Sequence, residues 1–296
     1  RGSWILLGGI VACSAIFSVV RSKRMRKILM SLRLVREGEY SHKIQMRGDD
    51  EYTTLATEFN KLTDRLQESE ATQRQFVSDA SHELNTPLAS IKLLSDSILQ
   101  NEMDADTMRE FVADIGAESD RLTRMTQKLL TLSKADAQTT CEHEVVDLGE
   151  TVRRVFRMLV PLADRTEIKL TANLDRGCYV LSMEDDAYQI IFNLVENGIK
   201  YNHAGGSVHV TARHTQDEAE LLVEDTGMGI PQDAIEHIFE RFYRVDKARS
   251  RQAGGSGLGL SIVHELVERN FGTIEVSSKE GEGTKFTVRM PYFELE

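Results

Sequence analysis

Residues 76–91 read FVSDASHELNTPLASI, and this stretch predicts an amphipathic helix. Apolar side chains recur at helical spacing and form one stripe, which consists of Phe76, Ala80, Leu84, Leu88 and Ile91. His82 falls outside this stripe, so we expect its imidazole to face solvent. An exposed imidazole has an ordinary pKa of about 6.5, is largely neutral near pH 7, and can offer a ring nitrogen as a nucleophile.

Glu83 and Thr86 are the polar neighbours that bear on His82. Glu83 follows directly, and Thr86 lies four residues on, one helical turn away on the same face. Pro87 cannot donate a hydrogen bond to the carbonyl of Glu83, which loosens the helix beside the histidine. These surroundings suit a reactive histidine, but an idle surface histidine is compatible with the same residues.

A second amphipathic helix is expected after Asp104, which is a suitable N-cap. Its apolar positions follow heptad spacing and are Phe111, Ile115, Leu122, Met125, Leu129 and Leu132. Two such helices form an antiparallel hairpin whose apolar stripe one chain does not fully cover. We therefore expect two chains to combine into a four-helix bundle, as a homodimer.

Strands and helices mix beyond a polar linker at residues 135–144. Helices are expected at 147–163, 184–201 and 258–270, with Asp147 capping the first. Strands are expected at 168–174, 179–183, 207–213, 220–224, 273–278 and 284–290. This order predicts an α+β sandwich with the helices on one face of the sheet.

The end of the expected helix at 184–201 carries a group of polar residues, which are Asn193, Asn197, Lys200 and Tyr201. Asn193 and Asn197 share one helix face through their four-residue spacing. Magnesium prefers oxygen ligands and retains waters, so one amide oxygen together with phosphates is adequate to hold it. Lys200 can neutralise phosphate charge. Each residue alone would fit a solvent-exposed polar face, whereas the group favours a nucleotide site.

A second cluster reads DTGMGI at residues 225–230. An ionised carboxylate only accepts hydrogen bonds, so Asp225 suits the adenine amine and would repel the carbonyl of guanine. This cluster therefore predicts ATP over GTP. Gly227 and Gly229 are expected to permit the positive backbone angles of a tight turn, although D-x-G-x-G is also a common turn without a ligand.

A third cluster reads GGSGLGLSI at residues 254–262, where glycines lead into a helix. Free amides at a helix start form a site for phosphates, although flexible loops often contain the same glycine pattern. The long stretch between the second and third clusters contains Phe239, Phe242, Tyr243 and Arg244. We expect it to be a mobile lid rather than a structural connector.

An apolar run without a charge extends from Trp4 to Val20, near the lower length limit of a membrane-spanning helix. A basic cluster at residues 21–27 follows it, and the positive-inside rule then places the rest of the chain in the cytoplasm. The alternative is a secretory signal peptide, but its charged region would contain only Arg1, and an ATP-using domain would be exported away from ATP. We expect a helix at 4–20 that anchors the chain in the cell membrane.

Composition sets further bounds. A chain of 296 residues with 41% apolar content can hold two or three folding units. Its formal net charge of −11 argues against nucleic acid as a partner. Cys13, Cys141 and Cys178 are far apart and odd in number, so neither a disulfide framework nor a zinc site is indicated.

Residues 21–70 contain two short heptad segments joined by a glycine-bearing connector at 38–48. This arrangement resembles a HAMP linker, a parallel four-helix relay between membrane and kinase. No proline stands in its first helix, where that family usually has one, so the entry geometry of the linker is open. An ordinary coiled-coil spacer would have the same periodicity.

The string SHELNTPL resembles the H-box of the dimerising and histidine-phosphotransfer domain of sensor histidine kinases. Four later strings, FNLVENGIKYN, DTGMGI, FERFYRVD and GSGLGL, resemble in order the N-, G1-, F- and G2-boxes of the GHKL nucleotide-binding fold. The resemblance divides the chain into a transmembrane helix (4–20), a HAMP-like linker (21–70), a dimerisation and phosphotransfer hairpin (71–136) and an ATP-binding catalytic domain (142–296).

The resemblance also implies roles. His82 would be the phosphoacceptor, Glu83 would accept or orient the proton on its other ring nitrogen, and Thr86 would position water that dephosphorylates the partner. The implied ATP-binding residues are Asn193, Asn197, Lys200, Tyr201, Asp225, Gly227, Gly229, Arg244, Gly255, Gly257, Leu258 and Gly259, with Asn197 also the ligand of Mg²⁺. The implied function is ATP-dependent phosphorylation of His82 and transfer to an aspartate of a cytoplasmic response regulator. Two rivals are a GHKL ATPase of the chaperone or repair kind and a non-catalytic membrane adaptor.

Overall fold

The computed structural model describes residues 22–48, 50–136, 143–245 and 256–294. The chain divides into two compact units, Arg1–Ser81 and His82–Glu296, and each is described by itself. Across the described ranges, no helix has both the length and the apolar character that a bilayer crossing requires. The expected membrane helix at 4–20 lies outside these ranges.

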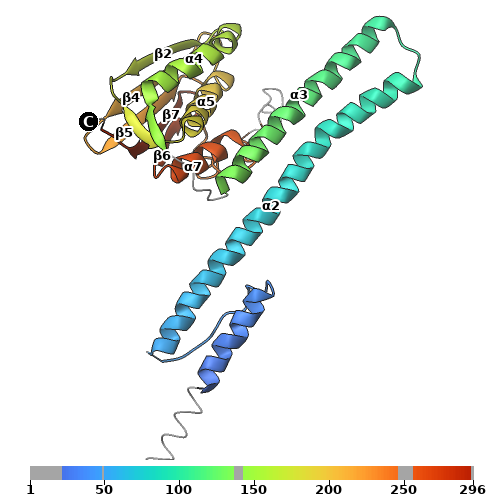
Figure 1. The fold of residues 1–296 in the computed structure, drawn as a ribbon. Helices are drawn as coiled ribbons and strands as arrows, with labels where there is room; N and C mark the ends of the chain where they lie inside the picture. Colours follow the sequence, from blue (N-terminus) through green and yellow to red (C-terminus); the bar gives the residue numbers. More distant parts are fainter. Residues whose placement is uncertain (1–21, 49, 137–142, 246–255, 295–296) are drawn as a thin grey trace, which may run out of the picture. The chain divides into compact units, whose positions relative to one another are not determined.

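In the first unit, a helix over residues 22–36 and the start of helix α2 (Glu51–Gln100) are joined by a connector without regular structure (Figure 1). A small core gathers side chains from all three segments, namely Ile28, Ile44, Ala56 and Phe59. Asn60 secures the connector, because its amide oxygen accepts from the N–H of Ile44 at 2.8 Å and its amide nitrogen donates to the carbonyl of Ile44 at 3.0 Å. The connector is therefore part of the packed structure of this unit.

Helix α2 is continuous through Gln100, and Pro87 lies inside it. The expected boundary between a linker that ends at residue 70 and a hairpin that starts at 71 therefore falls within one helix. No glycine or proline occurs in residues 61–75, so nothing local ends the helix there. Helix α3 (Ala105–Asp136) follows, and Asp104 accepts from the backbone N–H of Thr107 at 2.9 Å, which confirms the predicted N-cap.

The C-terminal part contains one five-stranded sheet and one two-stranded ladder. Its elements in chain order are β1 (Glu144–Asp147), α4 (Leu148–Arg165), β2 (Lys169–Leu174), β3 (Tyr179–Ser182), α5 (Glu184–Lys200), β4 (Ser207–His214), β5 (Glu218–Asp225), α7 (Gly259–Arg269), β6 (Thr273–Lys279) and β7 (Gly283–Pro291). The sheet order is β2-β4-β5-β7-β6, parallel only between β2 and β4. Strand β3 pairs instead with β1, which the sequence reading missed because the four residues of β1 are too short to show alternation.

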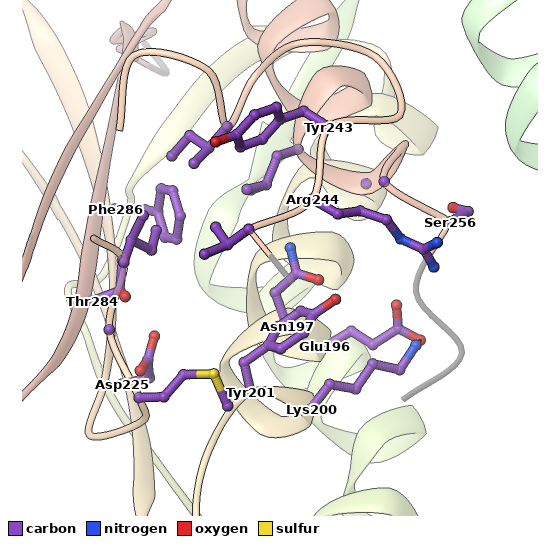
Figure 2. A pocket seen from close by; sticks show the side chains of 18 of the residues that line it. Glu196, Asn197, Lys200, Tyr201, Asp225, Tyr243, Arg244, Ser256, Thr284 and Phe286 are labelled. Atoms are coloured by element: carbon purple, nitrogen blue, oxygen red, sulfur yellow. The ribbon is translucent and has the colours of Figure 1, made fainter. Parts of the chain in front are cut away.

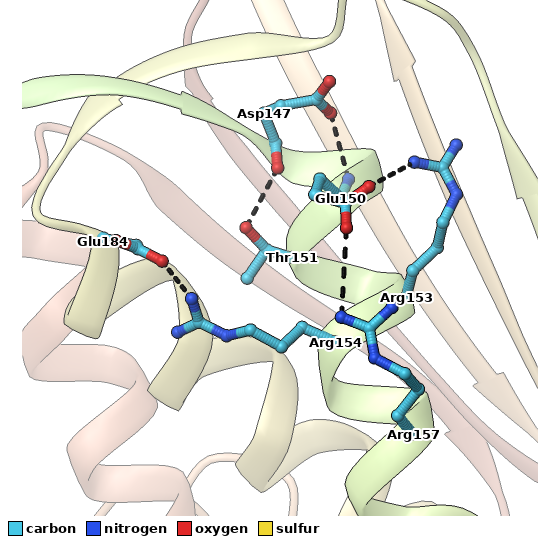
Figure 3. Close-up of polar contacts among 7 residues, drawn as sticks. All are labelled: Asp147, Glu150, Thr151, Arg153, Arg154, Arg157 and Glu184. Atoms are coloured by element: carbon cyan, nitrogen blue, oxygen red, sulfur yellow. Dashed lines mark hydrogen bonds and ion pairs between the residues drawn. The ribbon is translucent and has the colours of Figure 1, made fainter.

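Helices α4, α5 and α7 cover one face of this sheet, which confirms the predicted sandwich (Figure 1). Helix α4 contacts β2 and β4, α5 contacts β4 and β5, and α7 contacts β6, while α5 packs between the other two helices. The start of α4 is set as predicted, since Asp147 accepts from the N–H of Glu150 at 3.1 Å (Figure 3). An ion pair between Arg154 and Glu184 joins α4 to the first turn of α5 (Figure 3).

A buried polar group joins α5 to the end of α7. Asp186 accepts from Arg269 Nε at 3.0 Å and from Asn270 Nδ2 at 2.9 Å, and its side chain is only 5% exposed. We expect Asp186→Ala to lower the free energy of unfolding by about 3–5 kcal/mol, because it removes a buried carboxylate that pairs with Arg269 and accepts from Asn270. Denaturant unfolding measures this. Asp185→Ala is the matched control, since Asp185 is exposed in the same helical turn and its loss should change stability by under about 1 kcal/mol. Equal effects of the two changes would contradict the prediction.

Candidate functional site

One cavity lies at the C-terminal end of α5, beside the end of β5 and the starts of β7 and α7. Eight residues singled out from the sequence line it, namely Asn197, Lys200, Tyr201, Asp225, Gly229, Arg244, Gly257 and Gly259. They come from segments up to 62 positions apart in the chain (197 to 259), so folding brings the three sequence clusters into one site.

Helix α5 places Asn197 and Lys200 on the wall of this cavity, within the last turn of the helix. Lys200 is held by Glu196, with Nζ and the carboxylate 2.9 Å apart. Glu196 also lines the cavity, and the sequence reading had not selected it. The sequence did contain a signal for Glu196, because this residue lies four positions before Lys200 and therefore on the same helix face.

Asp225 ends β5 and brings a carboxylate to the cavity. Its Oδ1 accepts from the N–H of Gly227 at 2.8 Å. Burial raises the pKa of Asp225 to about 6, while hydrogen bonds from the backbone of Gly227 and Thr284 oppose the rise. The strand register pairs Asp225 with Thr284 and Val223 with Phe286, so β7 lays Thr284 and Phe286 along the same wall. Sequence reasoning missed these two residues because a strand partner is set by tertiary pairing.

The two glycines beside Asp225 are needed for different reasons. Gly229 has φ +67°, as predicted for a tight turn. Gly227 is not among the residues with positive φ, so the prediction was wrong for it. A Cβ at Gly227 would instead come within 2.5 Å of the carbonyl oxygen of Tyr201 and 2.9 Å of Asp225 Oδ1. Close approach of two backbone segments, which local turn chemistry does not reveal, excludes a side chain there.

Gly229→Ala should destabilise the protein strongly. A Cβ there would lie 2.1 Å from the carbonyl oxygen of Lys279, in addition to the cost of positive φ, and together we expect a loss of about 2–5 kcal/mol. Gly281→Ala separates the two causes, since Gly281 has φ +82° but nothing within 4 Å of its Cβ position, and it should cost about 1–2 kcal/mol. Thermal unfolding of both variants measures the difference. Equal losses of stability would show that the structure relaxes around the new Cβ at position 229.

The remaining nucleotide-binding predictions fall around this cavity. Asn193 is 1% exposed and lies behind the wall, where a Cβ on Gly259 would be 3.5 Å from its Oδ1. Leu258 is fully buried, so it packs in the core. Gly255 lies outside the described residues. The lid segment is described up to residue 245, where Phe242 donates its N–H to the carbonyl of Gly257 at 2.9 Å; its expected mobility stays a prediction.

The side chains at this cavity suit a hydrated magnesium ion. Both amide atoms of Asn193 are buried, and no described residue forms a hydrogen bond with them. Asn197 lies one turn further along α5, on the cavity wall. Over the described ranges, no group of three or more His, Cys, Asp or Glu side chains could chelate a metal ion alone. An amide oxygen at the position of Asn197 suits an ion that retains waters and also binds phosphate oxygens.

The cavity has two chemically different ends. Figure 2 shows Asp225, Thr284 and Phe286 on one side, and Lys200, Glu196, Arg244 and Ser256 on the other, with Asn197 between them. The first end offers an acceptor beside an aromatic ring, which suits a flat heterocycle with an exocyclic amine. The second end offers cations, which suit phosphates. The two ends thus suit the two chemically different parts of a nucleotide.

His82, Glu83 and Thr86 lie on α2, and none of them lines the cavity. His82 is exposed, as predicted, and the hydroxyl of Thr86 donates to its carbonyl at 3.1 Å. Glu83 connects to the cavity, because its carboxylate is 3.8 Å from Arg244 Nη1 and 3.9 Å from Arg121 Nη2. Arg244, predicted to approach phosphates, therefore also contacts the residue next to the histidine.

Two family descriptions match the chain. Residues 72–138 match the His Kinase A (phospho-acceptor) domain, which includes His82. Residues 182–294 match the histidine kinase-, DNA gyrase B- and HSP90-like ATPase, which includes the described cavity residues from Glu196 to Phe286. The second match begins at the end of β3, so β1, α4 and β2 lie before it.

Curated relatives agree with these matches. The chain is 38% identical over 225 residues to the sensor-like histidine kinase SenX3 of Mycolicibacterium smegmatis, which covers 76% of this chain and 59% of the relative. It is 33% identical over 290 residues to the sensor histidine kinase YclK of Bacillus subtilis, covering 95% of this chain and 61% of the relative. The chain thus spans about three fifths of the length of these curated relatives.

Among solved structures, the histidine kinase ThkA in complex with the response regulator protein TrrA has a similar fold. Its TM-score is 0.64 at 19% identity, and the match covers 77% of this chain and 64% of that chain. At this identity the likeness concerns the fold alone.

Proposed function

The chain carries the phospho-acceptor and ATPase domains of a histidine kinase, and from this premise we propose that it is the membrane-proximal and catalytic part of a sensor histidine kinase. In this proposal His82 is phosphorylated by ATP and passes the phosphoryl group to an aspartate of a response regulator. The observation that carries the proposal is an exposed histidine whose neighbour Glu83 contacts Arg244 of the nucleotide cavity within one compact unit.

The proposed reaction is in-line attack of a His82 ring nitrogen on the γ-phosphorus of ATP, which breaks the bond to ADP. Glu83 accepts or orients the proton on the other ring nitrogen. Lys200 and Arg244 offset phosphate charge, and Asp225 accepts from the adenine amine. Mg²⁺, when held by Asn197 and the phosphates, would offset further charge. Catalysis then consists largely of positioning and electrostatics.

A homodimer is part of this proposal. Leu88, which the stripe of α2 was expected to bury, is 50% exposed, and Leu93 and Leu99 of the same helix are 68% and 82% exposed. On α3, Val112 is 56% exposed. Apolar side chains at these positions support a second chain that completes a four-helix bundle.

We also propose that residues 21–70 are a HAMP-like linker and that residues 4–20 cross the cell membrane, with the kinase region in the cytoplasm. The connector packed between two helices through Ile44 and Asn60 supports the linker. Leu55, Leu62 and Leu66, spaced by seven and four residues, are all more than a third exposed, which supports pairing with a second copy. The apolar run and the basic cluster after it support the membrane helix.

The proposed partner is a cytoplasmic response regulator, with Thr86 positioning water for its dephosphorylation. Thr86 is exposed one turn from His82, which supports access of a partner to both. The net charge of −11 gives no support to nucleic acid as a partner.

Incubation with labelled ATP and Mg²⁺ tests the proposal. We expect label on the chain that is stable to base and sensitive to acid, as for a phosphoramidate, and its transfer to one member of a panel of response regulators. A GHKL ATPase of the chaperone or repair kind would release phosphate without labelling itself, and an adaptor would do neither. Nucleotide binding without such label would overturn the proposal.

A further inference from the structure

Lys128 is a cavity residue that neither the sequence clusters nor the ATPase match contains. It lies on α3, in the helical hairpin, whereas the ATPase match begins at residue 182. Its side chain lines the same cavity as Asn197, Lys200 and Arg244. The nucleotide cavity is therefore closed on one side by the hairpin of the same chain.

The surroundings of Lys128 hold more positive than negative charge. Lys128 is half-buried, and within the described ranges no ion pair or hydrogen bond of its ammonium group occurs. Burial lowers the pKa of Lys128; the nearby carboxylate of Glu196 opposes this effect, and the charges of Lys200 and Arg124 add to it. Glu196 is already paired with Lys200 at 2.9 Å. Partly desolvated cations without an equal number of anions are costly, so an anionic ligand would stabilise the cluster.

A second cavity continues from the first along α3. It is lined by four cationic side chains, Arg121, Arg124, Lys128 and Lys200, and it shares Lys128, Glu196, Lys200 and Ser256 with the nucleotide cavity. Arg121 at its other end lies 3.9 Å from Glu83, the neighbour of His82. Lys128 thus stands where the phosphate end of the nucleotide cavity opens toward the phosphoacceptor helix.

We propose that Lys128 binds the terminal phosphate of ATP, so that the hairpin supplies one ligand of the triphosphate and ADP lacks that contact. This inference rests on the proposed function, since it assumes that the cavity takes ATP. An ammonium group suits the role because it is a compact point charge on a flexible stem that can follow a phosphate as it moves.

The test measures binding to the whole chain. In the presence of Mg²⁺, dissociation constants are determined calorimetrically for a non-hydrolysable ATP analogue and for ADP. Lys128→Gln should weaken the analogue about 10–100-fold, as for loss of a charge-assisted hydrogen bond, and ADP less than about threefold. Lys128→Arg should recover most of the loss, because it keeps the charge. Lys92→Gln is the matched control: Lys92 is exposed on α2, outside both cavities, and its loss should change neither constant.

Two results would overturn the inference: unchanged binding of the analogue by Lys128→Gln, or equal weakening of analogue and ADP.

A measurement on the parent chain covers the case in which the variant does not fold. Acetylation of Lys128 by an amine-reactive ester, followed by mass spectrometry, should slow in the presence of the analogue but not of ADP, and equal rates would contradict the inference. These readouts do not depend on phosphorylation of His82. If Lys128→Gln selectively loses analogue binding but the parent chain acquires no label on His82, only the kinase reaction is refuted. If the parent chain acquires normal label and Lys128→Gln binds the analogue like the parent, only the role of Lys128 is refuted.

Discussion

Replacing His82 with glutamine should abolish acid-labile phosphate on the chain and leave nucleotide binding unchanged. Glutamine has no nucleophilic ring nitrogen, so the proposed attack on the γ-phosphorus cannot occur. His82 is exposed and does not line the nucleotide cavity, so we expect stability to change by no more than about 0.5 kcal/mol. The measurements are label incorporation from ATP and calorimetric binding of a non-hydrolysable analogue.

His42→Gln is the control for this experiment, because His42 is an exposed histidine in the connector of the first unit. It should incorporate label like the parent chain. Label of normal amount and acid sensitivity on the His82→Gln chain would show that another residue is the phosphoacceptor. If the His82→Gln chain lost both label and nucleotide binding, the substitution would have disrupted the folded cavity rather than only removed the nucleophile.

The second large effect is expected at Asp225. Asp225→Asn should weaken ATP binding by about 10–100-fold, because the carboxylate proposed to accept from the adenine amine is replaced by an amide that can also donate. Preference for ATP over GTP should fall with it, since an amide N–H can donate to the guanine carbonyl. Asp217→Asn is the control, because Asp217 is exposed in the turn before β5. Unchanged selectivity would contradict the assignment of Asp225 to the base.

The same carboxyl group predicts a pH dependence. Burial raises the pKa of Asp225 from 3.8 to about 6, so the proton is held more tightly in the folded than in the unfolded chain. The protonated carboxyl group of Asp225 therefore contributes stability that is lost as pH rises from about 4 to about 6. Above that range the buried carboxylate lowers the free energy of unfolding. The proposed contact with adenine uses the ionised form, so ATP binding should tighten as pH rises through about 6.

Thermal unfolding without nucleotide checks the sign. Asp225→Asn should melt at a higher temperature than the parent chain at pH 7, and the gap should shrink as pH falls toward 4, where the parent carboxyl is protonated. A parent chain that is more stable than Asp225→Asn at pH 7 would show that the hydrogen bond from Gly227 outweighs burial.

Local patterns in the sequence were sufficient for several features. The apolar stripe of residues 76–91 left His82 exposed, and the caps at Asp104 and Asp147 began their helices where expected. The end of α5 carried Asn197 and Lys200 to the cavity. Helical periodicity and capping act within a few residues, so the order of residues is enough to reveal them.

Other features depended on contacts between distant segments. The pairing of β3 with β1, the placement of Thr284 and Phe286 opposite Asp225, and the exclusion of a side chain at Gly227 all follow from strand register and backbone approach. Lys128 reads in sequence as one more polar position of an amphipathic helix, and only the packing of α3 against α7 brings it to the nucleotide cavity. The sequence by itself therefore determined the exposure of His82 and the helix end that carries Asn197 and Lys200. The tertiary structure decided which further side chains join them, because burial and charge at the site arise from segments far apart in the chain.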